Sequence, residues 1–336
     1  MGEDPLFMST KESSAEKAGQ DAVANLNKRT GRNMPQAVAT GALLVVIILA
    51  CILVRIDAFI YLIVIFMTLG LWELRVDFAT AGLHIPVIEL WICSAATMLA
   101  SFYAPDHVVV MTAGVLVTAL IGALAATRNH RLGGRLLKAV NAKLSGKDAQ
   151  TMADASYGAA KGESQSSSLA NVGVTLLTVV YITLLACLIT LPTTFGGHPA
   201  AHAFMVIFLP ALSDIGGLLF GSLFGKHKIA PRISPGKSLE GLAGSMLCCL
   251  VGALVIFAAT YPMADWGRIW WVALLMGIMV GATGTLGDLS ASLIKRDLGI
   301  KDMGHLLKGH GGVLDRVDSI LMSAPFITLV LLITGL

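Results

Sequence analysis

The chain has 336 residues, of which 55% are hydrophobic and only 13% are charged, and its formal net charge is +3. Its mean hydropathy of +0.77 lies well outside the range of soluble domains, in which about a quarter of the residues are charged. The composition therefore excludes an ordinary soluble protein and predicts an all-α polytopic integral membrane protein.

Residues 1–36 are polar and are expected to form a disordered cytoplasmic tail. They contain no apolar core of a secretory signal, and Leu6 stands where a myristoylation site that begins Met1-Gly2 requires Ser or Thr. The stretch from Ser13 to Arg29 can form a fraying surface helix. No pattern in this tail indicates chemistry.

Apolar stretches near or above the roughly 18 residues that a membrane-spanning helix needs recur along the rest of the chain. Nine spans are predicted, at residues 37–54, 58–75, 86–103, 108–126, 170–192, 199–222, 241–261, 269–287 and 319–336. The first four form an N-terminal transmembrane group, residues 37–126. The last five form a C-terminal transmembrane region, residues 170–336.

Residues 127–169 separate the two groups and are predicted to be a basic cytoplasmic linker. The stretch "RNHRLGGRLLKAVNAKL" spaces its leucines as a helix lying on the inner leaflet would, and "GESQSSSLA" is typical of a flexible connection. The basic residues of this interfacial helix either gather anionic lipids or act only as a retention signal.

The distribution of the 24 Lys and Arg residues predicts the orientation, because basic loops are retained in the cytoplasm. With the N-terminus inside, the inward segments are residues 1–36, the loop near Arg75, and residues 127–169, 223–240 and 288–318. Only Arg55 and Arg268 fall outside them. This bias supports nine spans, a cytoplasmic N-terminus and an external C-terminus.

The five cysteines all lie in apolar spans, at positions 51, 93, 187, 248 and 249. None belongs to a C-x-x-C motif, and no histidine lies at metal-ligand spacing from them. We therefore expect them to pack as small apolar side chains.

The first polar stretch that can carry chemistry is "LSDIGGLLFGSLFGKHKIAPRISPGKSLEG", residues 212–241. Asp214 lies inside the sixth span between Pro210 and Gly216-Gly217, where a helix can open and where an unpaired carboxylate would be costly. It is either functional or a structural partner that bridges helices. In the following loop, the "SPGKS" segment is expected to form a Pro-Gly turn that offers backbone N–H groups and a lysine to a phosphate.

The second stretch is "GDLSASLIKRDLGIKD", residues 287–302. If the eighth helix continues past the membrane, Asp288, Ser292, Lys295 and Arg296 share one of its faces. An acid for a metal and two bases for phosphates would then form one wall. A solvated helix end with salt bridges explains this stretch equally well.

The third stretch is "KGHGGVLDRVD", residues 308–318. Its glycines allow close backbone approach, and Asp315 and Asp318 follow in the first turns of the ninth helix. An aspartate near a helix start can be a cap. Capping accounts for only one aspartate, however, and leaves Gly-His-Gly-Gly and Arg316 unexplained.

The segment from Ser292 to Asp318, "SLIKRDLGIKDMGHLLKGHGGVLDRVD", resembles the signature of the phosphatidate cytidylyltransferases, also called CDP-diglyceride synthetases. The loop "FGKHKIAPRISPGKSLEG" is similar to a second motif of that family. The resemblance covers the C-terminal half strongly and the N-terminal half only by its hydrophobic layout. Lys308 departs from it, because the family usually has proline there, and Leu218 and Ser222 also differ.

The resemblance implies roles for the charged residues of both motifs. Asp288 and Asp315 would hold a Mg²⁺ centre, which can include a second cation such as K⁺, and Asp318 would ligate or orient it. His310 would hydrogen-bond the departing pyrophosphate. Four cations would neutralise the phosphates of both substrates: Lys295, Arg296, Lys301 and Arg316. The substrate-binding side would be formed by Asp214, Ser234, Lys237 and Ser292.

The reaction implied by the resemblance joins CTP to phosphatidic acid and gives CDP-diacylglycerol and pyrophosphate. CTP, phosphatidic acid and membrane lipids are then the expected partners at the cytoplasmic face of the plasma membrane. Nucleic acid is not expected, and a homodimer is compatible with the sequence, although no pattern in it requires one. Two alternatives stay open: another CTP-dependent lipid enzyme, such as a polyprenol or phytol kinase, and an anion transporter using Asp214 and Glu89.

Overall fold

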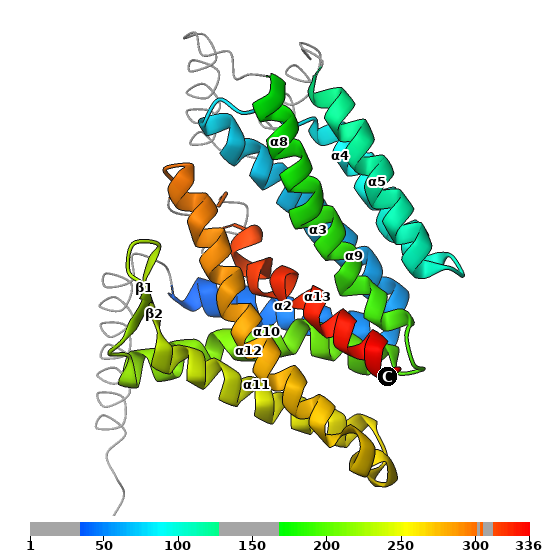
Figure 1. Ribbon diagram of the computed structural model, residues 1–336, viewed down its shortest axis with the longest axis vertical. Helices are drawn as coiled ribbons and strands as arrows, with labels where there is room; N and C mark the ends of the chain where they lie inside the picture. The colour runs from blue at the N-terminus through cyan, green and yellow to red at the C-terminus, as the bar shows by residue number, and fades with distance from the viewer. Residues whose placement is uncertain (1–33, 128–167, 301–302, 305–311) are drawn as a thin grey trace, which may run out of the picture.

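A computed structural model of the chain describes residues 34–127, 168–300, 303–304 and 312–336 (Figure 1). Each of the nine predicted spans contains a helix. In chain order the helical segments are α2 Met34–Val54, α3 Ile56–Thr80, α4 Val87–Tyr103, α5 His107–Ala126, α8 Ser168–Thr178, the π-helix η1 Val179–Leu184, α9 Leu185–Thr190, the 3₁₀-helix η2 Leu191–Thr194, α10 Pro199–Phe224, α11 Leu239–Thr260, the 3₁₀-helix η3 Met263–Asp265, α12 Trp266–Asp297 and α13 Leu314–Thr334.

Seven helical runs within the described residues are long and apolar enough to cross a membrane. The other two apolar helices, Thr40–Val54 and Val87–Tyr103, are shorter. The all-α polytopic prediction is therefore confirmed, while nine crossings and the orientation of the termini stay predictions. The interfacial helix of the linker and residues 1–33 of the predicted tail lie outside the described residues. The last residues of that tail, 34–36, belong to α2. All five cysteines are free.

The helices form two layers whose membership does not follow chain order (Figure 1). The run α8–η1–α9 packs along α5 and α4, beside α3, although it follows the long linker. The helix α2, at the other end of the chain, contacts α10. The helix α13 packs against both α9 and α12, so the last span joins the two layers.

The contact between α12 and α13 depends on Gly287, which precedes Asp288. A Cβ atom at this position would lie 2.6 Å from the carbonyl oxygen of Asp318 and 2.8 Å from Cα of Ser319. Real side chains do not tolerate such distances, so only glycine allows the two backbones to approach this closely. The close contact brings Asp288 next to the first turns of α13.

The helix α10 is continuous through Pro210 and past Asp214, so it does not open at the position where the sequence would allow it to open. Side-chain contacts next to Asp214 join this part of the helix to its neighbours. The Ser213 hydroxyl donates to the carbonyl oxygen of Gly281 on α12 (3.1 Å), and the Ser245 hydroxyl of α11 donates to the carbonyl oxygen of Ser213 (2.6 Å). Gly216 and Gly217 lie against α11, so packing rather than unwinding explains these glycines.

The loop after α10 contains a two-stranded antiparallel sheet, β1 Lys228–Ala230 and β2 Ser234–Ser238. The predicted Pro-Gly turn at "SPGKS" is therefore wrong, because this segment is a strand and the turn lies at residues 231–233. Proline is tolerated in β2 because a strand of a two-stranded sheet has a free edge, and the register is irregular here.

The sheet is fixed to the start of α11. Ser238, the last residue of β2, is the N-cap of α11 and accepts a hydrogen bond from the N–H of Gly241 (3.1 Å). The Glu240 carboxylate accepts bonds from the backbone N–H groups of Lys226 and His227 (3.1 and 3.2 Å) and contacts the His227 ring (2.7 Å). Lys237, the residue of β2 that precedes this N-cap, is therefore held in place by the strand and by the capped start of α11.

The N-terminus of α13 is capped by a residue from α3. The Glu73 side chain is 1% exposed, and its two oxygens accept hydrogen bonds from the backbone N–H groups of Val313 and Leu314, both at 2.9 Å. The first N–H groups of a helix have no partner within the helix. A carboxylate far away in the sequence satisfies two of them and fixes the position of α13.

Replacement of Glu73 by Gln should lower the thermal stability of the detergent-solubilised protein. The amide NH₂ group would face a buried backbone N–H donor and leave it unpaired, which costs roughly 1–3 kcal/mol. Thermal unfolding would measure the loss. The control is Asp57→Asn, because Asp57 pairs with Arg55 at an exposed site, where ion pairs contribute little. Equal melting temperatures for Glu73→Gln and the wild type would contradict the capping role.

Candidate active site

Four aspartates gather where α10, α12 and α13 meet. They are Asp214 of α10, Asp288 of α12, and Asp315 and Asp318 of α13, and the last is within electrostatic reach of the other three. The Ser319 hydroxyl donates to Oδ1 of Asp214 (3.0 Å), and Oδ1 of Asp318 accepts the N–H of Ser319 (2.7 Å). So many carboxylates in one part of a membrane bundle require cations nearby.

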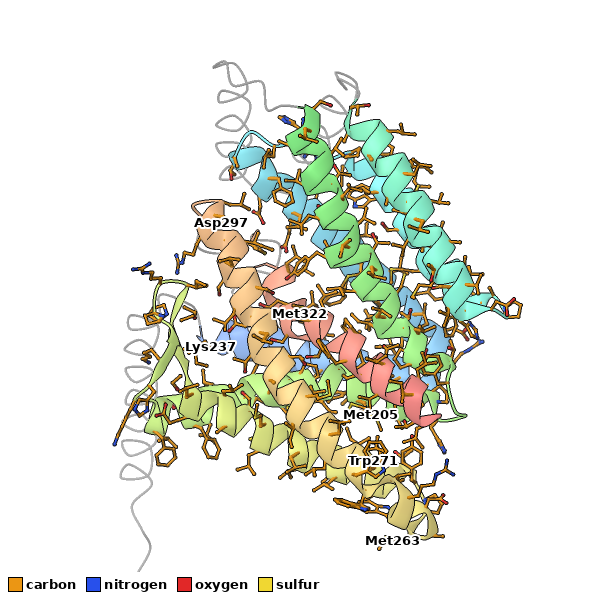
Figure 2. All side chains as sticks on the ribbon, viewed as in Figure 1. Met205, Lys237, Met263, Trp271, Asp297 and Met322 are labelled. Atoms are coloured by element: carbon orange, nitrogen blue, oxygen red, sulfur yellow. The ribbon has the colours of Figure 1, made fainter. Side chains whose placement is uncertain are left out.

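Two lysines supply positive charge from different segments. Lys237 of β2 contacts Asp288 at 2.6 Å, and Lys295, in the last turn of α12, contacts Asp315 at 2.7 Å. Figure 2 shows Lys237 between the sheet and α12. Both pairs are partly buried, which strengthens the attraction relative to a surface pair. The second oxygen of Asp315 accepts the backbone N–H of Met303 (3.0 Å).

The predicted common face on α12 exists, because this helix continues to Asp297. Its arginine, Arg296, donates from Nε to the carbonyl oxygen of Ile233 in the turn of the sheet (3.4 Å). Arg316 is exposed on the first turn of α13, within electrostatic reach of Asp214. Asp214 is also exposed, so the cluster reaches the protein surface at this residue, while Asp318 is buried.

The remaining predicted site residues differ in how far the structure places them. Ser292 lies on α12 one turn after Asp288 and is partly exposed. Ser234 begins β2, the strand that carries Lys237. Lys301 and His310 lie outside the described residues.

Two acids of α3 were missed when the sequence was interpreted. Glu73 caps α13, and Asp77, one turn later, is 5% exposed and lies within electrostatic reach of Lys295 and Asp315. Gly304 packs directly on Glu73, since a Cβ atom there would lie 2.6 Å from its carboxylate. The sequence did contain a signal: two acidic residues one helical turn apart inside an apolar span, in "GLWELRVDFAT".

The donor set of the cluster suits a hard divalent cation. Among the described residues, no three His, Cys, Asp or Glu side chains converge closely enough to hold a metal ion. Proteins usually bind Mg²⁺ in phosphate chemistry through one or two carboxylates plus the substrate's own phosphates, rather than through a complete protein cage. Asp288 and Asp315, on adjacent helices, match this requirement. The cluster can therefore accept a polyphosphate and its metal together.

Comparison with known proteins identifies the family of the chain. The sequence profile of the cytidylyltransferase family matches residues 35–334. A protein of Mycobacterium leprae (strain TN) named phosphatidate cytidylyltransferase is 33% identical over 296 residues, which cover 88% of this chain and 86% of the relative.

Other relatives match over shorter segments. A phosphatidate cytidylyltransferase of Mycobacterium bovis is 41% identical over 46% of this chain and 49% of its own length. One of Staphylococcus saprophyticus is 40% identical over 41% of this chain and 50% of its own length. These two alignments span about half of each relative. Since the family match extends over nearly the whole chain, this protein belongs to the cytidylyltransferase family.

Proposed function

We propose that this protein is a phosphatidate cytidylyltransferase, which converts CTP and phosphatidic acid into CDP-diacylglycerol and pyrophosphate. The observation that carries the proposal is the cluster of four aspartates with Lys237 and Lys295 at the junction of α10, α12 and α13. The relatives' names support the choice of substrates.

The main obstacle to this reaction is repulsion, because a lipid phosphate must approach the α-phosphorus of a nucleotide triphosphate. Catalysis of such transfers relies on positioning and charge neutralisation rather than on a protein nucleophile. A divalent metal, when bound, supplies neutralising charge between the phosphates. Asp288 and Asp315 would hold it, with Asp318 close behind them.

The two ion pairs suggest how the lysines act. Lys237 and Lys295 pair with the same two carboxylates that would hold the metal. Once these carboxylates are engaged, the ammonium groups become free to bind phosphate oxygens. Arg296 and Arg316 add fixed positive charge at the open side of the cluster, and Ser234 and Ser292 offer hydroxyl donors. Lys301 and His310 keep the roles that the resemblance implies.

We place the cluster at the cytoplasmic surface of the plasma membrane. The basic segments of the sequence, including residues 223–240 and 288–318, would lie on that side. CTP would then reach the site from the cytosol while the acyl chains stay in the bilayer. The proposed metal is Mg²⁺, with K⁺ as the candidate for a second cation.

The function is tested by omission of each component. Detergent-purified protein given CTP, phosphatidic acid and Mg²⁺ should release pyrophosphate and form a CDP-lipid, and omission of any one should abolish both. Formation of CDP and a phosphorylated lipid alcohol would indicate a lipid kinase instead. Absence of turnover with phosphatidic acid would contradict the proposal.

Asp315→Asn should lower the turnover number by roughly 100-fold or more, because a neutral amide cannot hold a divalent metal as a carboxylate does. Thermal unfolding would establish that the variant is folded. The matched control is Asp265→Asn, since Asp265 is an exposed residue before α12, and it should retain full activity. Near-normal turnover by folded Asp315→Asn would contradict the metal assignment.

Removal of divalent metal should stop pyrophosphate release, because the substrate charges would be uncompensated. Treatment with EDTA followed by addition of Mg²⁺ or of K⁺ alone would separate the two cations. Recovery with Mg²⁺ is the expected result. Full activity in excess EDTA would contradict a metal-dependent reaction.

A further inference from the structure

The fifth span is interrupted by a π-helical turn, η1, between α8 and α9. Such turns are rare within α-helices and occur frequently at functional sites. The extra residue rotates the side chains before the turn relative to those after it by about 100°. In this protein the turn lies beside the aspartate cluster and carries Tyr181.

Tyr181 is 8% exposed, and its buried hydroxyl has no hydrogen-bond partner among the described residues. Buried polar groups are nearly always paired, because an unpaired hydroxyl in an apolar environment is costly. Tyr261, another buried tyrosine, follows this rule, since its hydroxyl lies 3.3 Å from Nε2 of His202. The orphan hydroxyl of Tyr181 therefore needs an explanation.

The groups around the Tyr181 hydroxyl are the aspartates of the cluster and one serine. Asp288, Asp315 and Asp318 all lie within its electrostatic reach, and the Ser290 side chain is near enough to interact with the hydroxyl, although no contact between the two has the geometry of a hydrogen bond. The Ser290 hydroxyl donates its own proton to the carbonyl oxygen of Gly287 (2.7 Å). A phenol is a hydrogen-bond donor at neutral pH. The Tyr181 hydroxyl thus lies near the carboxylates beside which phosphates would bind, and its donor is not committed to a hydrogen bond with any described residue.

We propose that the Tyr181 hydroxyl donates a hydrogen bond to a phosphate oxygen of a bound substrate, either CTP or phosphatidic acid. The inference rests on the proposed function and adds a substrate-binding residue from the fifth span to it. The π-turn is then the device that turns this side chain toward α12 and α13. The hydroxyl has no hydrogen-bond partner among the described residues because, in this proposal, its partner is the substrate.

Tyr181→Phe removes only the hydroxyl. We expect kcat/KM to fall by about 10- to 100-fold, the range for a lost hydrogen bond to a charged group. A higher KM for CTP would identify the nucleotide, and a higher KM for phosphatidic acid in mixed micelles would identify the lipid. A lower kcat alone would place the bond in the transition state. The melting temperature should stay equal or rise, because a buried unpaired hydroxyl is lost.

The matched control is Tyr261→Phe, which removes a paired buried hydroxyl at the end of α11. It should lower the melting temperature and leave the kinetics unchanged. The inference is overturned if Tyr181→Phe has normal kinetics with both substrates. It is also overturned if this variant melts as early as the control and regains full kcat/KM at low temperature, since Tyr181 would then be structural.

Binding of CTP in the presence of Mg²⁺, measured by calorimetry, separates this inference from the proposed function. Active wild-type protein with an unaffected Tyr181→Phe variant would reject the inference alone. If the wild type binds the substrates without turnover, the proposed function fails. Weaker binding of CTP or of phosphatidic acid by Tyr181→Phe would then still support the hydroxyl contact, while equal binding of both would reject it. Wild-type protein that neither turns over nor binds either substrate would overturn both.

Discussion

The arrangement of this protein depends on the cost of placing carboxylates among membrane helices. A charged group in such an environment is tolerated only when it faces the bundle interior or a polar cavity and has partners. Glu73 has two backbone N–H groups, Asp288 has Lys237, Asp315 has Lys295 and an N–H group, and Asp214 has a hydroxyl. Each partner lies on a segment other than that of its carboxylate, so the need to pair these charges determines which segments must meet.

Close backbone packing makes these pairings geometrically accessible. Gly287 lets α12 and α13 approach until Asp288 lies next to the turns that carry Asp315 and Asp318. The capped start of α11 holds Lys237 on the other side. Charge and packing therefore act together: the glycine contact sets how closely the carboxylates approach, and Lys237 and Lys295 compensate the charges of Asp288 and Asp315.

Much of the site could be predicted because helical periodicity is local. The positions of Asp288 and Lys295 on α12, and of Asp315 and Asp318 on α13, follow from spacing alone once the helices are recognised. The pairing of Lys237 with Asp288 and the contact of Glu73 with α13 could not be predicted this way, because they join segments without a shared motif. The turn expected at Pro235-Gly236 was wrong because composition indicates turns without regard to the free edge of a short sheet.

The cap on α13 has a consequence for how the protein is made. Membrane helices are synthesised and inserted from the N-terminus, so α3 enters the bilayer long before Val313 and Leu314 leave the ribosome. Until then the Glu73 carboxylate lacks its two native partners and must be protonated, hydrated or shielded from lipid in another way. The last helix thus completes both the fold and the site, because a nascent chain that stops short of it lacks the partners of Glu73 as well as Asp315 and Asp318.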